Sequence, residues 1–112
     1  MEVTLTELGE ATVVKITGSV DSLNADQLSA TLAPPIARGR VQLVADFSSV
    51  NYTSSAGLRS LLGAVNDTRR KGGDLRIAAL QPQVERVLAL AGFTGIIKIF
   101  ADVESAVASY RA

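Results

Sequence analysis

The sequence predicts a single α/β domain, with a mixed, mostly parallel sheet of about five strands and about four helices. Short β-branched runs alternate with helical patterns from residue 11 to the end of the chain. Gly9-Glu10 alone separates the first two runs, which predicts an N-terminal hairpin with its first strand at an edge. No linker, repeat or low-complexity tract divides the chain, so residues 1–112 are treated as one domain.

The N-terminal elements are a hairpin and the start of a helix. The hairpin pairs VTLTEL, residues 3–8, with ATVVKIT, residues 11–17, because each run is short and rich in β-branched residues. In DSLNADQL, Asn24 followed by Gln27 predicts a reciprocal capping box at a helix N-terminus.

The first helix should bury one apolar face and stop early. That face comprises Leu28, Leu32 and Ile36. Proline lacks an amide donor and its ring crowds the preceding turn. Pro34-Pro35 therefore predicts a kink or a new short turn at Ala33-Pro34.

A central strand and a second helix follow. The run VQLVADF, Val41 to Phe47, is short and apolar, as a buried strand is. The helix after it has an apolar face at the spacing i, i+3, i+4 and i+7, formed by Leu58, Leu61, Leu62 and Val65. The stretch NYTSSAGLRSLL, Asn51 to Leu62, covers this turn, and the loop 50–57 lies where α/β domains present functional groups.

The C-terminal third repeats the alternation. Gly72-Gly73 ends the second helix, DLRIAAL, residues 74–80, forms a strand, and Pro82 suits the first position of a helix that Gly92 terminates. The inward face of this helix comprises Val84, Val87 and Leu88. IIKIF, residues 96–100, forms the last strand, and Asp102 caps a final helix. One face of that helix carries Val103, Val107 and Tyr110.

Composition excludes several classes of function. The chain has no Cys and no His, which removes thiol nucleophiles, imidazole metal ligands and Ser-His-Asp triads. The 11 Lys and Arg balance the 11 Asp and Glu, and Arg69-Arg70-Lys71 is too short to track nucleic acid phosphates. No apolar run approaches the roughly 18 to 20 residues that span a bilayer. We expect a cytoplasmic protein without membrane insertion, metal or nucleic acid.

The hydroxyl-rich junction admits several interpretations. Spacing favours a helix cap, in which Thr53, Ser54 or Ser55 satisfies free amides at the helix start. A phosphate-binding loop would need the G-x-x-x-x-G-K-[ST] pattern, and a serine hydrolase would need a G-x-S-x-G elbow with a histidine; the sequence has neither. A serine presented to another protein's active site is a further interpretation.

Several motifs in order carry a resemblance to a known family. They are Gly18-Ser19-Val20-Asp21, Asp46-Phe47, Ser54-Ser55-Ala56-Gly57-Leu58 and Ala91-Gly92-Phe93. Together they resemble the bacterial anti-sigma factor antagonists, small STAS-domain proteins of partner-switching circuits. The resemblance covers nearly all of the 112 residues and implies a single STAS-type domain.

The resemblance implies a phosphorylation switch in a protein that is not an enzyme. In such a circuit the unphosphorylated chain binds an anti-sigma factor that is also a serine kinase, and so releases a sigma factor. Ser55, two residues before Gly57, resembles the serine that this kinase phosphorylates. A PP2C-type serine phosphatase would restore binding. ATP and magnesium would belong to the kinase, so no cofactor is expected here.

The resemblance also suggests a binding surface. Asp21 matches the family's acidic residue beside the serine, although it also fits a simple turn residue. Asp46 is predicted to order the loop by accepting backbone N–H bonds. Ser54 and Ala56 replace the Asp and the Ser or Thr that often flank the acceptor, so Ser54 remains an alternative acceptor. The predicted partner-binding residues are Asp21, Tyr52, Thr53, Ser54, Ser55, Ala56, Gly57, Leu58 and Arg59, although helical spacing favours the core for Leu58.

A role in transport is the alternative within the same family. STAS domains also occur as accessory subunits of lipid-type ABC transporters and in the tails of sulfate transporters, where they act as scaffolds. An enzyme would require a metal or nucleotide site built from Asp21, Asp46 and nearby hydroxyls, whose spacing matches no known ligand pattern.

Overall fold

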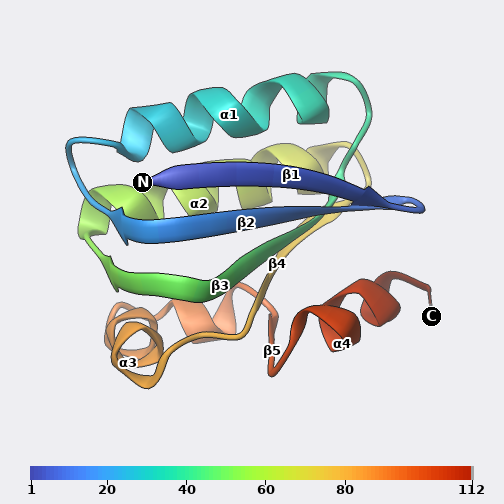
Figure 1. The fold of residues 1–112 in the computed structure, drawn as a ribbon. Coiled ribbons are helices and arrows are strands. Elements are labelled where there is room, and N and C mark those ends of the chain that lie inside the picture. The colour runs from blue at the N-terminus through green and yellow to red at the C-terminus, as the bar shows by residue number, and fades with distance from the viewer. Residues whose placement is uncertain (112) are drawn as a thin grey trace.

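The computed structural model describes residues 1–111. Its elements are β1 (Glu2–Leu8), β2 (Ala11–Val20), α1 (Ala25–Ala37), β3 (Gln42–Thr53), α2 (Ser55–Arg70), β4 (Asp74–Ala78), α3 (Pro82–Leu90), η1 (Phe93–Gly95), β5 (Ile99–Phe100), α4 (Val103–Ala108) and η2 (Ser109–Arg111), where η denotes a 3-10 turn (Figure 1). The predicted α/β class, with five strands and four helices, is confirmed.

The strands form one sheet in the order β1-β2-β3-β4-β5, the same order as in the chain. β1 pairs antiparallel with β2, while the other neighbouring strands pair in parallel. The predicted edge hairpin and the central place of β3 are thus confirmed. Because the carboxyl ends of β2, β3 and β4 share one edge, the loops that lead into α1, α2 and α3 gather there.

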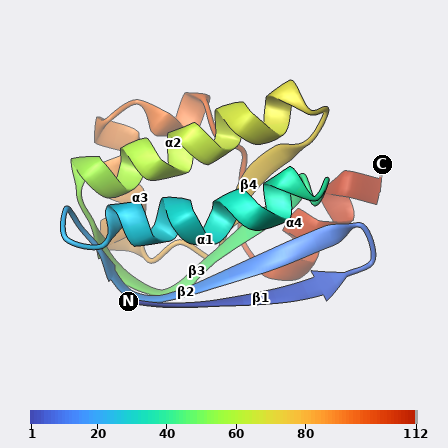
Figure 2. The ribbon, with the colours of Figure 1, turned by 90° about the horizontal axis from the view of Figure 1, so that it is seen from above.

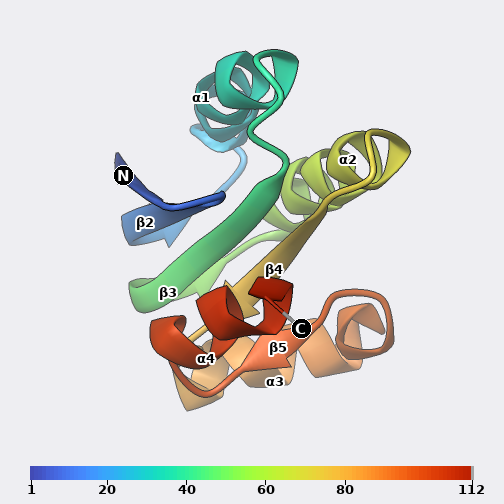
Figure 3. The same ribbon diagram turned by 90° about the vertical axis from the view of Figure 1, so that its right-hand side faces the viewer.

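Two hydrophobic cores cover the two faces of the sheet. Alternate residues of a strand point to opposite faces, so Leu43 packs into the larger core with α1, α2 and α3, and Val44 into the smaller one with Val107 of α4. Figure 2 shows α1 and α2 running side by side across one face. Figure 3 shows α4 on the other side of the strands from α1 and α2.

Asn24 is the N-cap residue of α1, but its side chain does not cap the helix. Its Oδ1 accepts the Asp21 N–H at 2.9 Å, and its Nδ2 donates to the Ser19 carbonyl at 2.9 Å. The predicted capping box with Gln27 is therefore wrong. The amide instead ties the start of α1 back to the end of β2.

The proline pair lies inside α1, which runs on to Ala37. The helix is therefore not interrupted at Ala33-Pro34, and the predicted new short turn is wrong. Pro35 is buried in the helix's inner face, and the Arg38 N–H donates to the carbonyls of Pro34 and Pro35, each at 3.1 Å. The amides that proline removes fall close to the helix end, where the burial of Pro35 offsets their loss.

β3 extends to Thr53 instead of ending near Phe47, so the predicted loop 50–57 begins as strand. The end of β2 holds this extension in parallel register, with Val20 opposite Thr53. Register shifts between Lys15 and Thr17 and between Gly18 and Ser19 bend the pair. The junction to α2 is consequently a sharp turn on a paired strand.

The C-terminal elements are shorter than predicted. Only Ile99–Phe100 of the predicted strand 96–100 pairs with β4, and Tyr110 lies in η2, beyond the end of α4. Asp102 caps α4 as predicted, because its Oδ1 accepts the Ser105 N–H at 2.7 Å. Gly92 follows α3 with a left-handed φ of 82°, which suits its predicted role as a terminator.

A buried polar network closes the amino ends of β3 and β4. Asp74 is 6% exposed, and its carboxylate accepts from Nε of Arg69 at 2.9 Å and from Nε of Arg76 at 3.2 Å. The Arg76 guanidinium lies 4.0 Å from the centre of the Tyr110 ring. The Tyr110 hydroxyl is 2.7 Å from the Leu43 carbonyl oxygen and 2.8 Å from that of Asp74. The C-terminal turn is thereby fastened to the two central strands.

Candidate functional site

The three hydroxyl residues at the start of α2 have different surroundings. Thr53 is 2% exposed and belongs to β3. Ser54 is the N-cap: its Oγ accepts the Gly57 N–H at 3.2 Å, and its own N–H donates to the Val20 carbonyl at 2.9 Å. Ser55, the first residue of α2, is exposed. Capping therefore occupies Ser54 and leaves the Ser55 hydroxyl facing solvent.

Gly57 allows the first turn of α2 to rest directly on the strand ends. A Cβ at this position would lie 2.8 Å from the Val20 carbonyl oxygen and 2.8 Å from Thr53 Oγ1. Real Cβ atoms essentially never approach other atoms that closely. Glycine is needed here for close backbone approach, and the contact fixes the position of Ser55 relative to β2 and β3.

Asp21 organises the loop between β2 and α1. Its Oδ1 accepts the N–H groups of Leu23 at 2.9 Å and Asn24 at 3.3 Å, so its role as a turn residue is real. This loop adjoins the start of α2, because Val20 bonds to Ser54 and the Ser60 hydroxyl donates to the Ala25 carbonyl at 2.9 Å.

The same loop and the adjoining strand ends hold features that the sequence did not predict. Leu23 is 94% exposed at the tip of the turn. The Ser19 hydroxyl donates to Oδ1 of Asn51 at 3.0 Å, which links the ends of β2 and β3. An apolar residue inside the polar run DSLN was the one available signal for Leu23; the Ser19–Asn51 link depends on strand register and has no local signal.

The predicted partner-binding residues separate into surface and interior positions. Tyr52 is 52% exposed on the end of β3, and Arg59 is exposed on α2. Leu58 is 3% exposed and packs into the larger core, so burial takes it out of the predicted surface. Thr53 and Gly57 are buried too and shape the turn from within.

Asp46 lies away from this turn. Its Oδ1 accepts the Ser48 N–H at 3.0 Å, within β3 and beside the register shift against Lys15 and Thr17. The carboxylate does accept a backbone N–H, as predicted, but it orders the irregular part of the strand and not the turn at Ser55.

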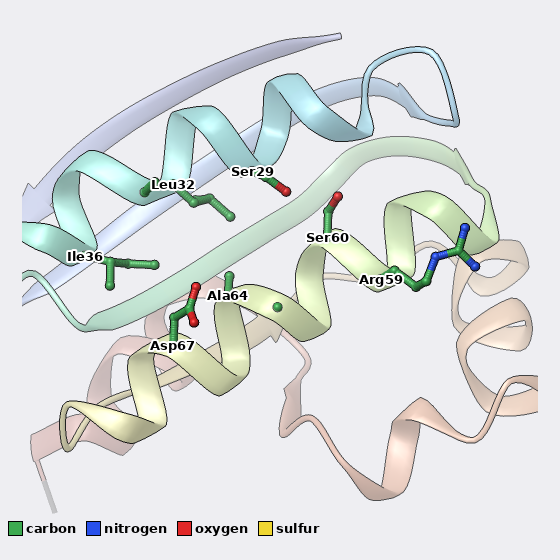
Figure 4. A pocket seen from close by; sticks show the side chains of 9 residues that line it. Ser29, Leu32, Ile36, Arg59, Ser60, Ala64 and Asp67 are labelled. Atoms are coloured by element: carbon green, nitrogen blue, oxygen red, sulfur yellow. The ribbon is translucent and has the colours of Figure 1, made fainter.

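A small pocket lies between α1 and α2 (Figure 4). Its volume is about 110 Å³, and it is lined by Ser29, Leu32, Ala33, Ile36, Arg59, Ser60, Gly63, Ala64 and Asp67. Ligand pockets typically measure about 300 to 1,000 Å³. This pocket is below that range and is too small for a typical cofactor.

Two absences hold for residues 1–111. These residues contain no cluster of three or more carboxylates that would suit a metal ion. None of the helices described combines the length and apolar character needed to cross a bilayer.

Comparison with known proteins identifies the fold family. The family model described as "STAS domain" matches residues 2–106. BtrV of Bordetella bronchiseptica, provisionally named an anti-sigma factor antagonist, is 32% identical over 99% of this chain and 96% of its own.

Solved structures give the same picture of the fold. The crystal structure of a provisionally named anti-sigma factor antagonist from Thermotoga maritima has a TM-score of 0.93 at 18% identity, covering 98% of this chain and 95% of that one. Phosphorylated SpoIIAA from Bacillus has a TM-score of 0.76 at 20% identity, covering 97% and 99%. With its sheet order, its capped serine turn and this family match, the chain belongs to the STAS domain family.

Proposed function

We propose that this chain is an anti-sigma factor antagonist whose binding is switched by phosphorylation of Ser55. The unphosphorylated form binds an anti-sigma factor that is also a serine kinase, and so releases a sigma factor. A PP2C-type phosphatase removes the phosphate and restores binding. The circuit operates in the cytoplasm; ATP and magnesium belong to the kinase, and the chain catalyses no reaction itself.

The division of roles between Ser54 and Ser55 is the observation that carries this proposal. A kinase needs a free hydroxyl that reaches its active site without unfolding the substrate. The Ser54 hydroxyl already caps α2, whereas Ser55 is exposed beside it. The relative BtrV, provisionally named an anti-sigma factor antagonist, supports the proposed class of protein. The structure of phosphorylated SpoIIAA from Bacillus supports a switch by phosphorylation.

The phosphate should act on the interface and leave the fold intact. It adds about 1.5 to 2 negative charges at pH 7, and a helix N-terminus favours negative charge. A partner carboxylate about 4 Å away would be repelled by a few kcal/mol at an effective dielectric constant near 20. That corresponds to roughly a hundredfold to thousandfold loss of affinity.

Tyr52 and Arg59 are the proposed surface contacts around the switch. Both are exposed and flank Ser55 in sequence, and aromatic and Arg side chains are enriched at the centres of interfaces. Asp21 shapes the neighbouring loop, so its contribution to binding is mainly to hold that loop in place.

The test compares phosphorylation and binding in matched variants. The chain purified from its own cells should carry an increment of about 80 Da that peptide mapping assigns to Ser55. The cognate anti-sigma factor should bind Ser55→Ala tightly and Ser55→Asp weakly. Ser105→Asp, which adds the same charge to an exposed position in the first turn of α4, should bind like wild type.

Two results would overturn this function. Equal affinity of Ser55→Ala and Ser55→Asp for the anti-sigma factor would remove the switch. A chain that stays unmodified and binds a transporter ATPase in place of an anti-sigma factor would indicate the accessory subunit of a lipid-type ABC transporter.

A further inference from the structure

Arg59 lies one helical turn after Ser55 on α2. Residues at i and i+4 of a helix share a face, with Cβ atoms about 5 to 6 Å apart. Long side chains on a helix lean toward its N-terminus, so the Arg59 side chain leans over the turn that begins at Ser55. Figure 4 shows it extended toward that end of α2.

The Arg59 guanidinium has no protein counter-charge in the structure as described. Among residues 1–111, no carboxylate lies within 4.0 Å of it and no hydrogen bond engages it, although four other arginines pair with carboxylates. Those four are Arg40, Arg69, Arg70 and Arg76. An exposed cation is thus available beside the serine.

Arg59 is the one cation on residues 51–62 and on the adjoining loop, residues 21–24. The first two turns of α2, residues 55–62, contain Arg59 as their single charged residue. The adjoining loop, residues 21–24, carries only the acidic Asp21, whose Oδ1 already accepts two backbone N–H groups. A negative group on Ser55 would therefore find a balancing charge one turn away on its own helix.

We propose that Arg59 binds the phosphate on Ser55 as an intramolecular i, i+4 ion pair. The inference rests on the proposed function, because it concerns the phosphorylated state. The anion stands N-terminal to the cation, which is the favoured orientation on a helix. The planar guanidinium can donate two parallel N–H bonds to phosphate oxygens.

This pair gives phosphorylation a second effect. In the unmodified chain, Arg59 presents a free guanidinium that fits an acidic group on the partner. Phosphorylation then withdraws that cation and replaces a neutral hydroxyl with a paired anion. The partner loses an attraction at Arg59 and meets a negative charge at Ser55 in the same event.

The experiment uses chains in which phosphoserine is installed at residue 55 during synthesis. Three proteins are compared by phosphorus NMR titration at low salt: the wild-type background, Arg59→Gln and Arg38→Gln. Arg38 is the matched control, because it is also exposed and lies at the C-terminal end of α1, the end away from Ser55. Asp21 is present in all three proteins, so its effect on the phosphate pKa is the same in each.

An ion pair holds the phosphate in its dianionic form. The second pKa of the phosphate should therefore be lower by roughly half a unit in the wild-type and Arg38→Gln backgrounds than in the Arg59→Gln background. A shift of this size is typical of a surface ion pair. The difference should shrink as salt is added. The Arg59 Nε–H resonance should also shift when the phosphate is present.

The inference would be overturned if the phosphate has the same second pKa in the Arg59→Gln and wild-type backgrounds and the Arg59 Nε–H resonance does not shift. Because the phosphate is installed and no kinase is used, this result is independent of whether cells phosphorylate Ser55. Failure of the ion pair and failure of the proposed switch are thereby distinguishable.

Discussion

Replacing each of the two adjacent serines with alanine should separate the structural residue from the switch residue. Ser54→Ala removes the N-cap bond to the Gly57 N–H. Losing such a cap typically costs about 1 kcal/mol of folding stability, within a range of about 0.5 to 2 kcal/mol. Ser55 is exposed, so Ser55→Ala should change the free energy of unfolding by less than about 0.5 kcal/mol.

Urea unfolding of the unphosphorylated proteins measures this difference. With a slope of about 1 to 3 kcal/mol per molar urea, the Ser54→Ala midpoint should fall by roughly 0.3 to 1 M. Its melting temperature should fall by roughly 4 °C. Ser54→Asp is the control, because Asp is also a good N-cap and should retain most of the stability.

Two outcomes would contradict this assignment of the cap: Ser55→Ala destabilises the protein as much as Ser54→Ala does, or Ser54→Asp is no more stable than Ser54→Ala. A confirmed difference would also bear on the choice of acceptor. A phosphate on Ser54 would have to disturb the cap that positions α2, whereas a phosphate on Ser55 would not.

Two further predictions concern packing and pH. Gly57→Ala should lower the free energy of unfolding by about 1 to 3 kcal/mol, because the added Cβ would overlap the Val20 carbonyl. The control in the same urea titration is Gly63→Ala, where an added Cβ meets open space. Burial raises the pKa of Tyr110 above its usual value. The unfolded chain therefore loses this proton first, so stability should be full below about pH 10 and decline as the pH rises above it. Tyr110→Phe should cost about 0.5 to 1.5 kcal/mol at neutral pH, because it removes the hydroxyl that bonds to the Leu43 and Asp74 carbonyls. Thermal melts of this variant from pH 8 to 11 should show a shallower alkaline decline, and an unchanged decline would contradict the assignment.

Local patterns were enough to predict the architecture. The helix of Leu58, Leu61 and Val65 and the central strand that contains Leu43 have clear periodicity, so their order and faces follow from the sequence. The turn at Ser55 was found for the same reason, because it lies between two well-patterned elements.

The predictions that were wrong concern residues whose contacts with other elements override their local secondary-structure preference. Asn24 has the composition of a capping residue, yet its amide bonds to the end of β2. Pro35 stays in a helix because its ring is buried in the inner face. The length of β3 was underestimated at Ser48 and Ser49. The register shift there breaks the alternation of apolar and polar residues by which a strand is predicted from sequence.

The agreement between strand order and chain order has a consequence for how the molecule is built during synthesis. Each new strand adds to a free edge, and none has to enter between two strands that are already paired. Every pairing therefore closes a comparatively short segment of chain, which favours rapid folding. Because N-terminal segments emerge first from the ribosome, β1, β2, β3 and α2 can assemble the turn that carries Ser55 before β4 and β5 join the sheet.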